Sequence, residues 1–182
     1  MTKQELFDSI KGKVIVSCQA VPGEPLYVEE KSIMYLMARA AKQAGTPAIR
    51  TSSIRDVIAI KEETGLPVIG LIKIKYPDAI LMADISTYEE GVRAWKLGMD
   101  IVGTTMSGYT SHSPKLDGPD YELVTKLSQT VDIPVIGEGR VHSPEEAVKM
   151  LEAGAFAVVV GGAITRPLEI AARFIKAVEN RG

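Results

Sequence analysis

The sequence predicts an α/β protein, an incomplete (β/α) barrel of the TIM type with about seven strands, in a single domain of residues 1–182. The first observation is a series of short, continuously apolar runs, which is typical of buried parallel strands. The second is that helical patterns separate most of these runs. The third is a weak repeat of helix end, glycine, turn and strand in "KQAGTPAI", "WKLGMDIVG" and "LEAGAFAVVV". The repeat favours a barrel over a doubly wound open sheet, which remains the alternative.

The expected strands are rich in valine and isoleucine, and they span residues 14–20, 47–51, 67–73, 79–86, 100–107, 133–139 and 156–162. The expected helices span residues 31–44, 53–64, 87–97, 119–130, 143–153 and 166–180. Ser53, Thr87 and Ser143 are candidate N-caps, and Pro144 suits the first helical position. Four glycines are candidate C-terminal caps: Gly45, Gly65, Gly98 and Gly154.

The composition indicates which kinds of molecule the protein binds. The 182 residues are 46% hydrophobic and 24% charged, with a net charge of −2, so the chain has no basic field that would hold nucleic acid. Its one cysteine, Cys18, cannot form an internal disulfide, and no apolar run is long enough to cross a membrane. The first residues lack the apolar stretch of a signal peptide. We therefore expect a cytoplasmic protein that acts on a small molecule.

The stretch "IGLIKIKYPDAILMADIS", residues 69–86, joins two expected strands by a very short connection. Parallel neighbours in one sheet need a crossover of about a dozen residues or more, so these two strands cannot be adjacent parallel strands. Three arrangements remain: an antiparallel hairpin, an extended connector that passes the second half of the chain to a partner in a domain-swapped dimer, or residues absent from the numbered sequence.

Polar residues cluster at the ends of the expected strands, where a barrel gathers its functional groups. They are Ser17, Gln19, Arg50, Lys73, Asp84, Thr104, Thr105, Glu138, Arg140, Gly161, Gly162 and Thr165. The position of any single one of these residues is also explained by a role in capping a turn. As a set they predict a substrate site on one rim.

The segment "VVVGGAITRP", residues 158–167, predicts a phosphate-binding turn. Gly161 and Gly162 allow backbone N–H groups to approach an anion, and a helix begins near Arg166 with its positive end toward the same place. Gly139 lies in a second glycine turn expected beside it. The alternative is a tight turn followed by a solvated arginine.

Two residues are candidates for proton transfer. Glu138 follows an apolar strand between two glycines, and Lys73 follows "PVIGLI"; apolar surroundings of this kind can make a carboxyl or an ammonium group reactive. Asp84 in "MADIST" could position a hydroxyl or a lysine, or cap the next helix together with Thr87. Cys18 is expected in the core. No zinc cluster, other metal site or redox cofactor is expected.

Several motifs together resemble one bacterial family, N-acetylmannosamine-6-phosphate 2-epimerase: "VIVSCQA", "ILMADIST", "GTTMSGYT", "IPVIGEGRVHSPEEA" and "VVVGGAITRPLEI". The resemblance covers nearly the whole chain and implies a (β/α)8 barrel that interconverts N-acetylmannosamine 6-phosphate and N-acetylglucosamine 6-phosphate. It implies that Lys73 and Glu138 serve the proton transfers at C2, without a cofactor. The residues it implies for substrate binding are Gln19, Arg50, Asp84, Thr104, Gly139, Arg140, Gly161, Gly162 and Arg166.

The chain departs from the family between "VIGLIK" and "ILMADIS". Relatives place a helix, a fourth strand and another helix there, so about 50 residues are missing at the usual size of a barrel unit. Two functions follow as alternatives: an epimerase completed in a homodimer, or a truncated barrel that binds a sugar phosphate or anion without turnover. In the same way, Lys73 is either the family's lysine or a surface lysine from the helix before "ILMADIS".

Overall fold

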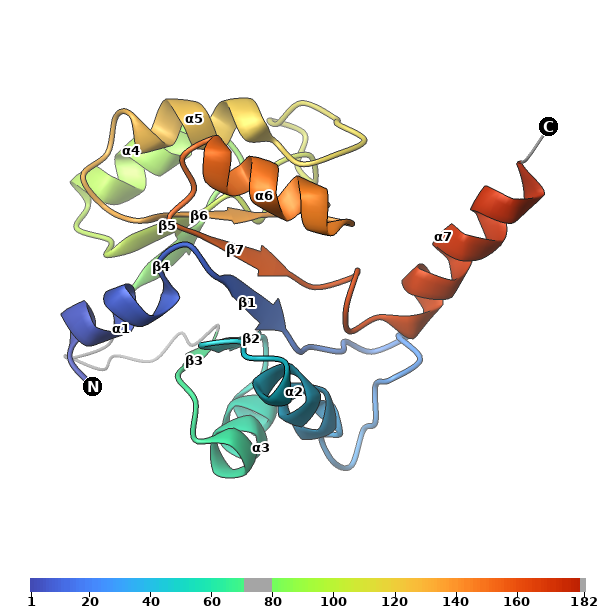
Figure 1. Ribbon diagram of the computed structural model, residues 1–182. Coiled ribbons are helices and arrows are strands. Elements are labelled where there is room, and N and C mark those ends of the chain that lie inside the picture. Colours follow the sequence, from blue (N-terminus) through green and yellow to red (C-terminus); the bar gives the residue numbers. More distant parts are fainter. Residues whose placement is uncertain (71–79, 181–182) are drawn as a thin grey trace. The chain divides into compact units, whose positions relative to one another are not determined.

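The computed structural model describes residues 1–70 and 80–180, in which strands and helices alternate along most of the chain (Figure 1). The described strands are β1 (Val14–Ser17), β2 (Ile49–Thr51), β3 (Val68–Gly70), β4 (Met82–Asp84), β5 (Ile101–Gly103), β6 (Val135–Glu138) and β7 (Ala157–Val160). The described helices are α1 (Lys3–Ile10), α2 (Met34–Gln43), α3 (Ile54–Thr64), α4 (Tyr88–Lys96), α5 (Tyr121–Ser128), α6 (Pro144–Glu152) and α7 (Pro167–Glu179). The predicted class, an incomplete TIM-type fold of about seven strands, is confirmed.

The chain divides into two compact units, each of which is described here by itself. The first unit comprises described residues 1–14 and 80–159, and the second comprises 15–70 and 160–180. In the first unit β4, β5, β6 and β7 are parallel neighbours in that order, with Asp84 opposite Gly103 and Glu138 opposite Val159. This register places the carboxyl ends of three consecutive strands side by side.

Helices α4, α5 and α6 cover one face of these strands (Figure 1). Helix α4 approaches α5 at Gly91, where an added Cβ would lie 2.6 Å from a methyl group of Leu127. Leu127 is fully buried, as are Val124 on the same helix and Met150 on α6. The apolar faces of the three helices and the strands therefore form the core of the first unit.

Helix α1 was not among the expected helices. Its start signal is a capping box: the Thr2 hydroxyl accepts from the Glu5 backbone N–H, and the Glu5 carboxylate accepts from the Thr2 N–H at 2.7 Å. The Phe7 ring meets the edge of Phe156 at 5.9 Å between centroids. The signal "TKQE" was in the sequence, but the helix is short and mostly exposed, so its apolar pattern was weak.

The expected N-caps of α3, α4 and α6 are confirmed. Ser53 caps α3, while Thr87 and Ser143 each form a capping box with the glutamate three residues later, Glu90 and Glu146. Pro144 occupies the start of α6 as predicted.

In the second unit β1, β2 and β3 are parallel, with Ser17 opposite Arg50 and Arg50 opposite Ile69. Helix α3 ends at Gly65, whose φ of 67° is the left-handed conformation that glycine adopts without strain. The core of this unit is built from residues of the strands and of α2 and α3: Val16, Cys18, Met34, Ala38, Ala41, Ile49 and Ile60.

The two strands joined by the short connection pair with different partners. Strand β3 pairs with β2 in the second unit, and β4 pairs with β5 in the first. This agrees with the expectation that they are not parallel neighbours. Residues 71–79 lie outside the described chain, so the expected strand 67–73 is described only as β3.

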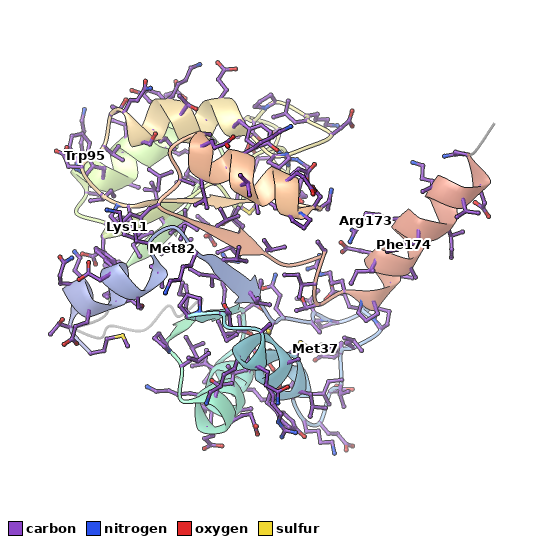
Figure 2. All side chains as sticks on the ribbon, in the orientation of Figure 1. Lys11, Met37, Met82, Trp95, Arg173 and Phe174 are labelled. Carbon is purple, nitrogen blue, oxygen red and sulfur yellow. The ribbon has the colours of Figure 1, made fainter. Side chains whose placement is uncertain are left out.

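Helix α7 has no buried residue among those described. Phe174 is 72% exposed, and Leu168, Ile175 and Val178 are also exposed (Figure 2). A helix with this many exposed apolar side chains presents a hydrophobic surface to its surroundings.

Candidate functional site

Three strand ends of the first unit bring two carboxyl groups to one hydroxyl. Asp84 ends β4, Thr105 follows β5, and Glu138 ends β6. Thr105 Oγ1 lies 2.8 Å from Asp84 Oδ1 and 2.9 Å from Glu138 Oε2. Both distances are those of good hydrogen bonds. Asp84 thus contacts a hydroxyl of this chain, while Thr87 caps α4 with its own side chain.

Thr104 fixes the end of β5 to the end of β6. Its hydroxyl donates to the Glu138 carbonyl at 2.8 Å and accepts from the Glu138 N–H at 3.0 Å. Thr104 is fully buried. These two bonds fix the position of the Glu138 backbone. They therefore restrict where the Glu138 carboxyl group can lie.

Gly103 has no side chain beside the Thr105 hydroxyl and the Asp84 carboxylate. A Cβ at this position would collide with the Met82 side chain and would lie 3.3 Å from Thr105 Oγ1 and 3.6 Å from Asp84 Oδ1. A larger residue here would require the Met82 side chain to move.

Gly139 and Arg140 form the turn that follows Glu138. Both have a positive φ, 104° and 54°, which is uncommon for arginine. Arg140 Nε donates to the Gly118 carbonyl at 2.7 Å, Nη1 donates to the Ser107 carbonyl, and the guanidinium lies 5.3 Å from the centre of the Tyr109 ring. Arg140 therefore anchors the segment that follows β5.

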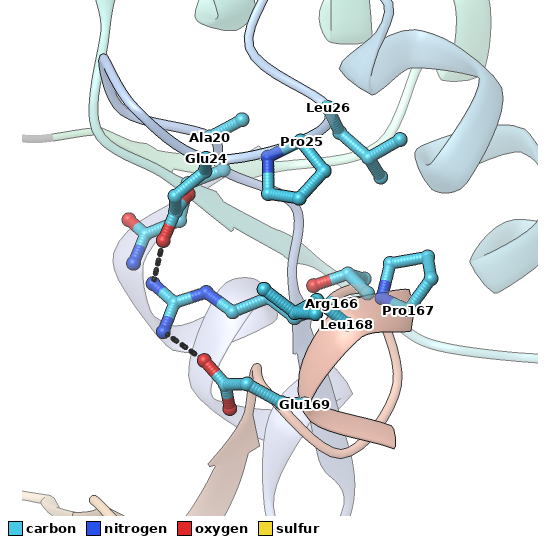
Figure 3. Close-up of a pocket in the computed structure, with 10 residues that line it drawn as sticks. Ala20, Glu24, Pro25, Leu26, Arg166, Pro167, Leu168 and Glu169 are labelled. Carbon is cyan, nitrogen blue, oxygen red and sulfur yellow. Dashed lines mark hydrogen bonds and ion pairs between the residues drawn. The ribbon is translucent and has the colours of Figure 1, made fainter. Parts of the chain in front are cut away.

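The second unit contains a pocket of about 350 Å³, including its open mouth (Figure 3). Its lining includes two predicted substrate residues, Gln19 and Arg166. The Arg166 guanidinium pairs with Glu24 at 3.2 Å and with Glu169 at 2.9 Å. Arg166 is thus held at the pocket by two carboxylates and is not simply a solvated helix-start residue.

Gly161 and Gly162 lead from β7 to α7 in a tight turn, the segment for which a phosphate site was predicted. The Gly161 carbonyl accepts from the N–H groups of Ile164 and Thr165, and the Thr165 hydroxyl donates to the Ser17 carbonyl at 2.7 Å. The Glu169 carboxylate lies against Gly162, where an added Cβ would collide with it. The predicted phosphate turn therefore has an acidic side chain beside it.

Arg50 is 3% exposed at the end of β2, next to buried Ser17 and Thr51. The hydroxyls of Ser17 and Thr51 have no hydrogen-bond partner within the described residues. Burial, followed by the nearby charge of Asp56, raises the pKa of the Cys18 thiol to about 12. A thiol that stays protonated is a poor nucleophile, in agreement with the expected core role of Cys18.

The predicted site residues fall into two groups. Asp84, Thr104, Glu138, Gly139 and Arg140 belong to the first unit, and the structure brings them together around the ends of β4, β5 and β6. The second unit contains Gln19, Arg50, Gly161, Gly162 and Arg166. Lys73 lies outside the described residues. Within the described chain, no group of three or more His, Cys, Asp or Glu side chains could hold a metal ion, and no helix is long and apolar enough to cross a membrane.

Sequence reasoning placed Thr105 among the strand-end residues but gave it no role. Its signal was the pair "TT" directly after β5, which places two hydroxyls at the carboxyl end of a strand; in the structure both bond to Glu138, Thr104 to its backbone and Thr105 to its carboxyl group. That both hydroxyls reach Glu138 depends on the strand register.

The comparisons with known proteins agree on one family. The family described as "Putative N-acetylmannosamine-6-phosphate epimerase" matches residues 34–80 and 74–180. The chain belongs to this family. A relative of the same description from Caldanaerobacter subterraneus is 42% identical over 230 positions, covering 98% of this chain and 96% of the relative. One from Clostridium perfringens is 42% identical over 218 positions, covering 93% and 98%.

Solved structures extend the comparison. The N-acetylmannosamine-6-phosphate 2-epimerase from Clostridium perfringens aligns with a TM-score of 0.86 and 41% identity, over 94% of this chain and 96% of that one. The (S)-3-O-geranylgeranylglyceryl phosphate synthase from Thermoplasma acidophilum aligns with a TM-score of 0.63 and 16% identity, over 98% of both chains. At that identity, the second likeness supports the fold alone.

The alignment length shows how much of a relative's sequence has no counterpart in this chain. The Caldanaerobacter alignment includes 98% of the 182 residues, about 178, within 230 positions, which leaves about 52 positions without a residue from this chain. The two segments of the family match meet at residues 74–80.

Proposed function

We propose that this chain interconverts N-acetylmannosamine 6-phosphate and N-acetylglucosamine 6-phosphate by removing the C2 proton and returning a proton to the opposite face. Family membership supports the substrate class. The observation that carries the chemistry is the placement of the Glu138 and Asp84 carboxyls around Thr105, at the carboxyl ends of adjacent strands. Carboxyl groups held at strand ends are the usual acids and bases of barrel enzymes.

The reaction needs an acidified C2 proton. That proton becomes acidic when the neighbouring carbon is carbonyl-like, so the sugar reacts in its open-chain form, and the developing enolate needs hydrogen-bond donors. In this proposal Glu138 takes or returns a proton on one face of C2, and Lys73 does so on the other. Arg50 and Gln19 donate to the enolate oxygen.

The 6-phosphate acts as a handle. In the proposal Gly161, Gly162 and Arg166 of the second unit bind it through backbone N–H groups and one guanidinium, and this remote binding energy holds the reacting carbon in place. For phosphate to reach Arg166, one of its carboxylate partners, Glu24 or Glu169, must give way.

Proton NMR in D2O with N-acetylmannosamine 6-phosphate tests the proposal. We expect loss of the C2–H signal together with the appearance of the epimer, and we expect Glu138→Gln to abolish both. The outcome that contradicts the proposal is a stable C2–H signal in the presence of folded, substrate-bound protein.

The alternative is a barrel that binds the sugar phosphate without turnover. The observation in its favour is the set of about 52 alignment positions that this chain lacks. The segment missing from the chain would have carried a strand end of the family site. Saturable binding by calorimetry combined with a stable C2–H signal would favour this alternative, and Glu138→Gln would then leave binding unchanged.

A further inference from the structure

The segment between β5 and α5 exposes an aromatic ring beside the turn that follows Glu138. Tyr109 is 63% exposed, and its Cε2 atom lies 3.9 Å from the point that a Cβ on Gly139 would occupy. Gly139 directly follows Glu138, whose carboxyl group we propose to act at C2 of the sugar. The Tyr109 ring therefore lies against the residue next to the proposed base, and all three residues belong to the first unit.

Arg140 holds one face of the Tyr109 ring. The centre of its guanidinium group lies over the ring at 5.3 Å from the ring centre, which is a cation–π distance. The guanidinium is itself fixed, because Nε donates to the Gly118 carbonyl at 2.7 Å and Nη1 donates to the Ser107 carbonyl. One face of the ring is thus occupied by a fixed cation, while most of the side chain stays exposed.

The backbone around Tyr109 forms a tight turn. The Tyr109 N–H donates to the Met106 carbonyl at 3.1 Å, and the Gly108 N–H donates to the Ser113 hydroxyl at 2.8 Å. Gly108 has a φ of 80°, and an added Cβ there would collide with the Arg140 guanidinium. A ring that is supported by its backbone and on one face loses little further freedom when a ligand binds, which favours a specific contact.

The proposed substrate carries an apolar group next to its reacting carbon. C2 bears an acetamido group, in which the carbonyl and the N–H form hydrogen bonds and the methyl group does not. An aromatic ring buries a methyl group favourably because both are apolar. If Glu138 reaches C2, the substituent on C2 is the part of the sugar that lies nearest to the neighbouring Gly139 and to the Tyr109 ring.

We propose that Tyr109 is a specificity-determining residue, whose exposed ring packs against the acetamido methyl group of the substrate. The site therefore prefers a 2-acetamido sugar phosphate to one with a hydroxyl group at C2. This inference rests on the proposed function for the identity of the ligand. Tyr109 exchanges no proton and forms no covalent bond with the sugar, and the contact depends on its ring and not on its hydroxyl.

Calorimetry with two ligands tests this preference. N-acetylglucosamine 6-phosphate and glucose 6-phosphate have the same phosphate and the same charge, and they differ at C2. Both epimers of the first ligand carry the acetamido group, so turnover during the measurement does not affect the comparison. Tyr109→Ala removes the ring, and Tyr109→Phe keeps the ring without its hydroxyl. Tyr35→Ala is the matched control, because the Tyr35 ring on α2 also lies under a guanidinium, that of Arg39 at 6.0 Å, and contributes nothing to the proposed site.

We expect Tyr109→Ala to lower the affinity for N-acetylglucosamine 6-phosphate about fourfold, which is the usual effect of one buried methyl group. The affinity for glucose 6-phosphate should change less than about twofold, because this ligand has no methyl group to lose. Tyr109→Phe and Tyr35→Ala should keep the preference of the parent for the acetylated ligand. An equal loss for both ligands in Tyr109→Ala would overturn the proposal, as would an unchanged preference.

A nuclear Overhauser effect between the acetyl methyl protons and the Tyr109 ring protons tests the contact in the parent protein itself. Tyr109→Phe assigns the ring signals, and the result does not depend on whether Tyr109→Ala folds. Absence of the effect in the saturated complex would overturn the proposal.

Exchange at C2 in D2O decides the proposed function separately. Exchange without the Overhauser effect rejects the Tyr109 contact and keeps the epimerase, whereas the effect without exchange keeps the contact and rejects turnover. A parent protein that binds neither sugar phosphate rejects both.

Discussion

Arg140 Nε donates to the Gly118 carbonyl oxygen at 2.7 Å, and the same guanidinium bonds to the Ser107 carbonyl. One side chain thus ties together two points of the segment between β5 and α5. Arg140→Lys keeps the charge but loses the planar fork that reaches both carbonyls. We expect a loss of about 1–3 kcal/mol in the free energy of unfolding, measured by urea denaturation.

Arg39→Lys is the control for this variant. Arg39 pairs with Glu63 on the surface at 2.7 Å, and exposed pairs contribute little. We expect the change there to be much smaller than for Arg140→Lys. Equal effects of the two substitutions would mean that Arg140 does not anchor the segment.

Glu90 gives a pH-dependent prediction. Hydrogen bonds from the side chain and backbone of Ser86 lower the pKa of the Glu90 carboxyl. A depressed pKa in the folded state stabilises the protein above the unfolded value of about 4.3, and this contribution is lost as the pH falls through the folded pKa. Because the Glu90 carboxyl is exposed and screened by solvent, Glu90→Gln should cost well under about 1 kcal/mol near pH 7, and progressively less below about pH 4.

Thermal unfolding of the parent and Glu90→Gln between pH 3 and 7 measures this difference. Glu89→Gln, one residue earlier in the same helix turn, controls for the change in net charge. A difference between parent and Glu90→Gln that stays constant across the range would contradict the capping role.

Glu169 should weaken phosphate binding. Its carboxylate pairs with Arg166 and lies against Gly162, so it occupies groups that we propose for the phosphate. Glu169→Gln should tighten inorganic phosphate binding about fivefold, equal to about 1 kcal/mol, by calorimetry. Glu179→Gln, at the far end of α7, should leave the affinity unchanged.

Gly162→Val tests the turn itself, since it adds a side chain where Glu169 now lies. We expect it to abolish phosphate binding at this turn. Unchanged affinity in Gly162→Val would refute the phosphate turn, and weaker binding in Glu169→Gln would mean that Glu169 orders Arg166 instead of competing for it.

We also propose a homodimer. The apolar face of α7, with Phe174 and Ile175 exposed, offers a surface that a second copy could cover, and the shortened connection favours exchange of segments between copies. Light scattering should give twice the 19.6 kDa chain mass at micromolar concentration. A monomer at all concentrations would refute the proposal. Phe174→Asp should weaken the dimer if α7 takes part, and the exposed control Glu179→Gln should not.

Sequence reasoning predicted the alternation of elements well because the signals are local. A capping residue such as Ser143 and a continuous apolar run such as "FAVVV" each specify one element without reference to the rest of the chain. Family membership, too, could be recognised from contiguous motifs. Helix α1 was missed because only one of its residues, Ile10, is buried, so its apolar pattern was too weak to stand out.

The contacts of the site could not be predicted in the same way. That Asp84 and Glu138 meet at Thr105 depends on the register of β4, β5 and β6, which no local pattern specifies. The pairing of Arg166 with Glu24 was also missed, because Glu24 is far from it along the chain and reaches it only in the folded unit.

The three capping boxes of the first unit bear on how this fold tolerates loss of sequence. In α1, α4 and α6 the helix start is encoded within four consecutive residues. This local signal does not depend on the residues that precede it, so loss of an internal stretch leaves the starts of these three helices intact. A barrel whose helix starts are encoded locally can therefore lose internal sequence while the remaining capped helices still begin at the same residues.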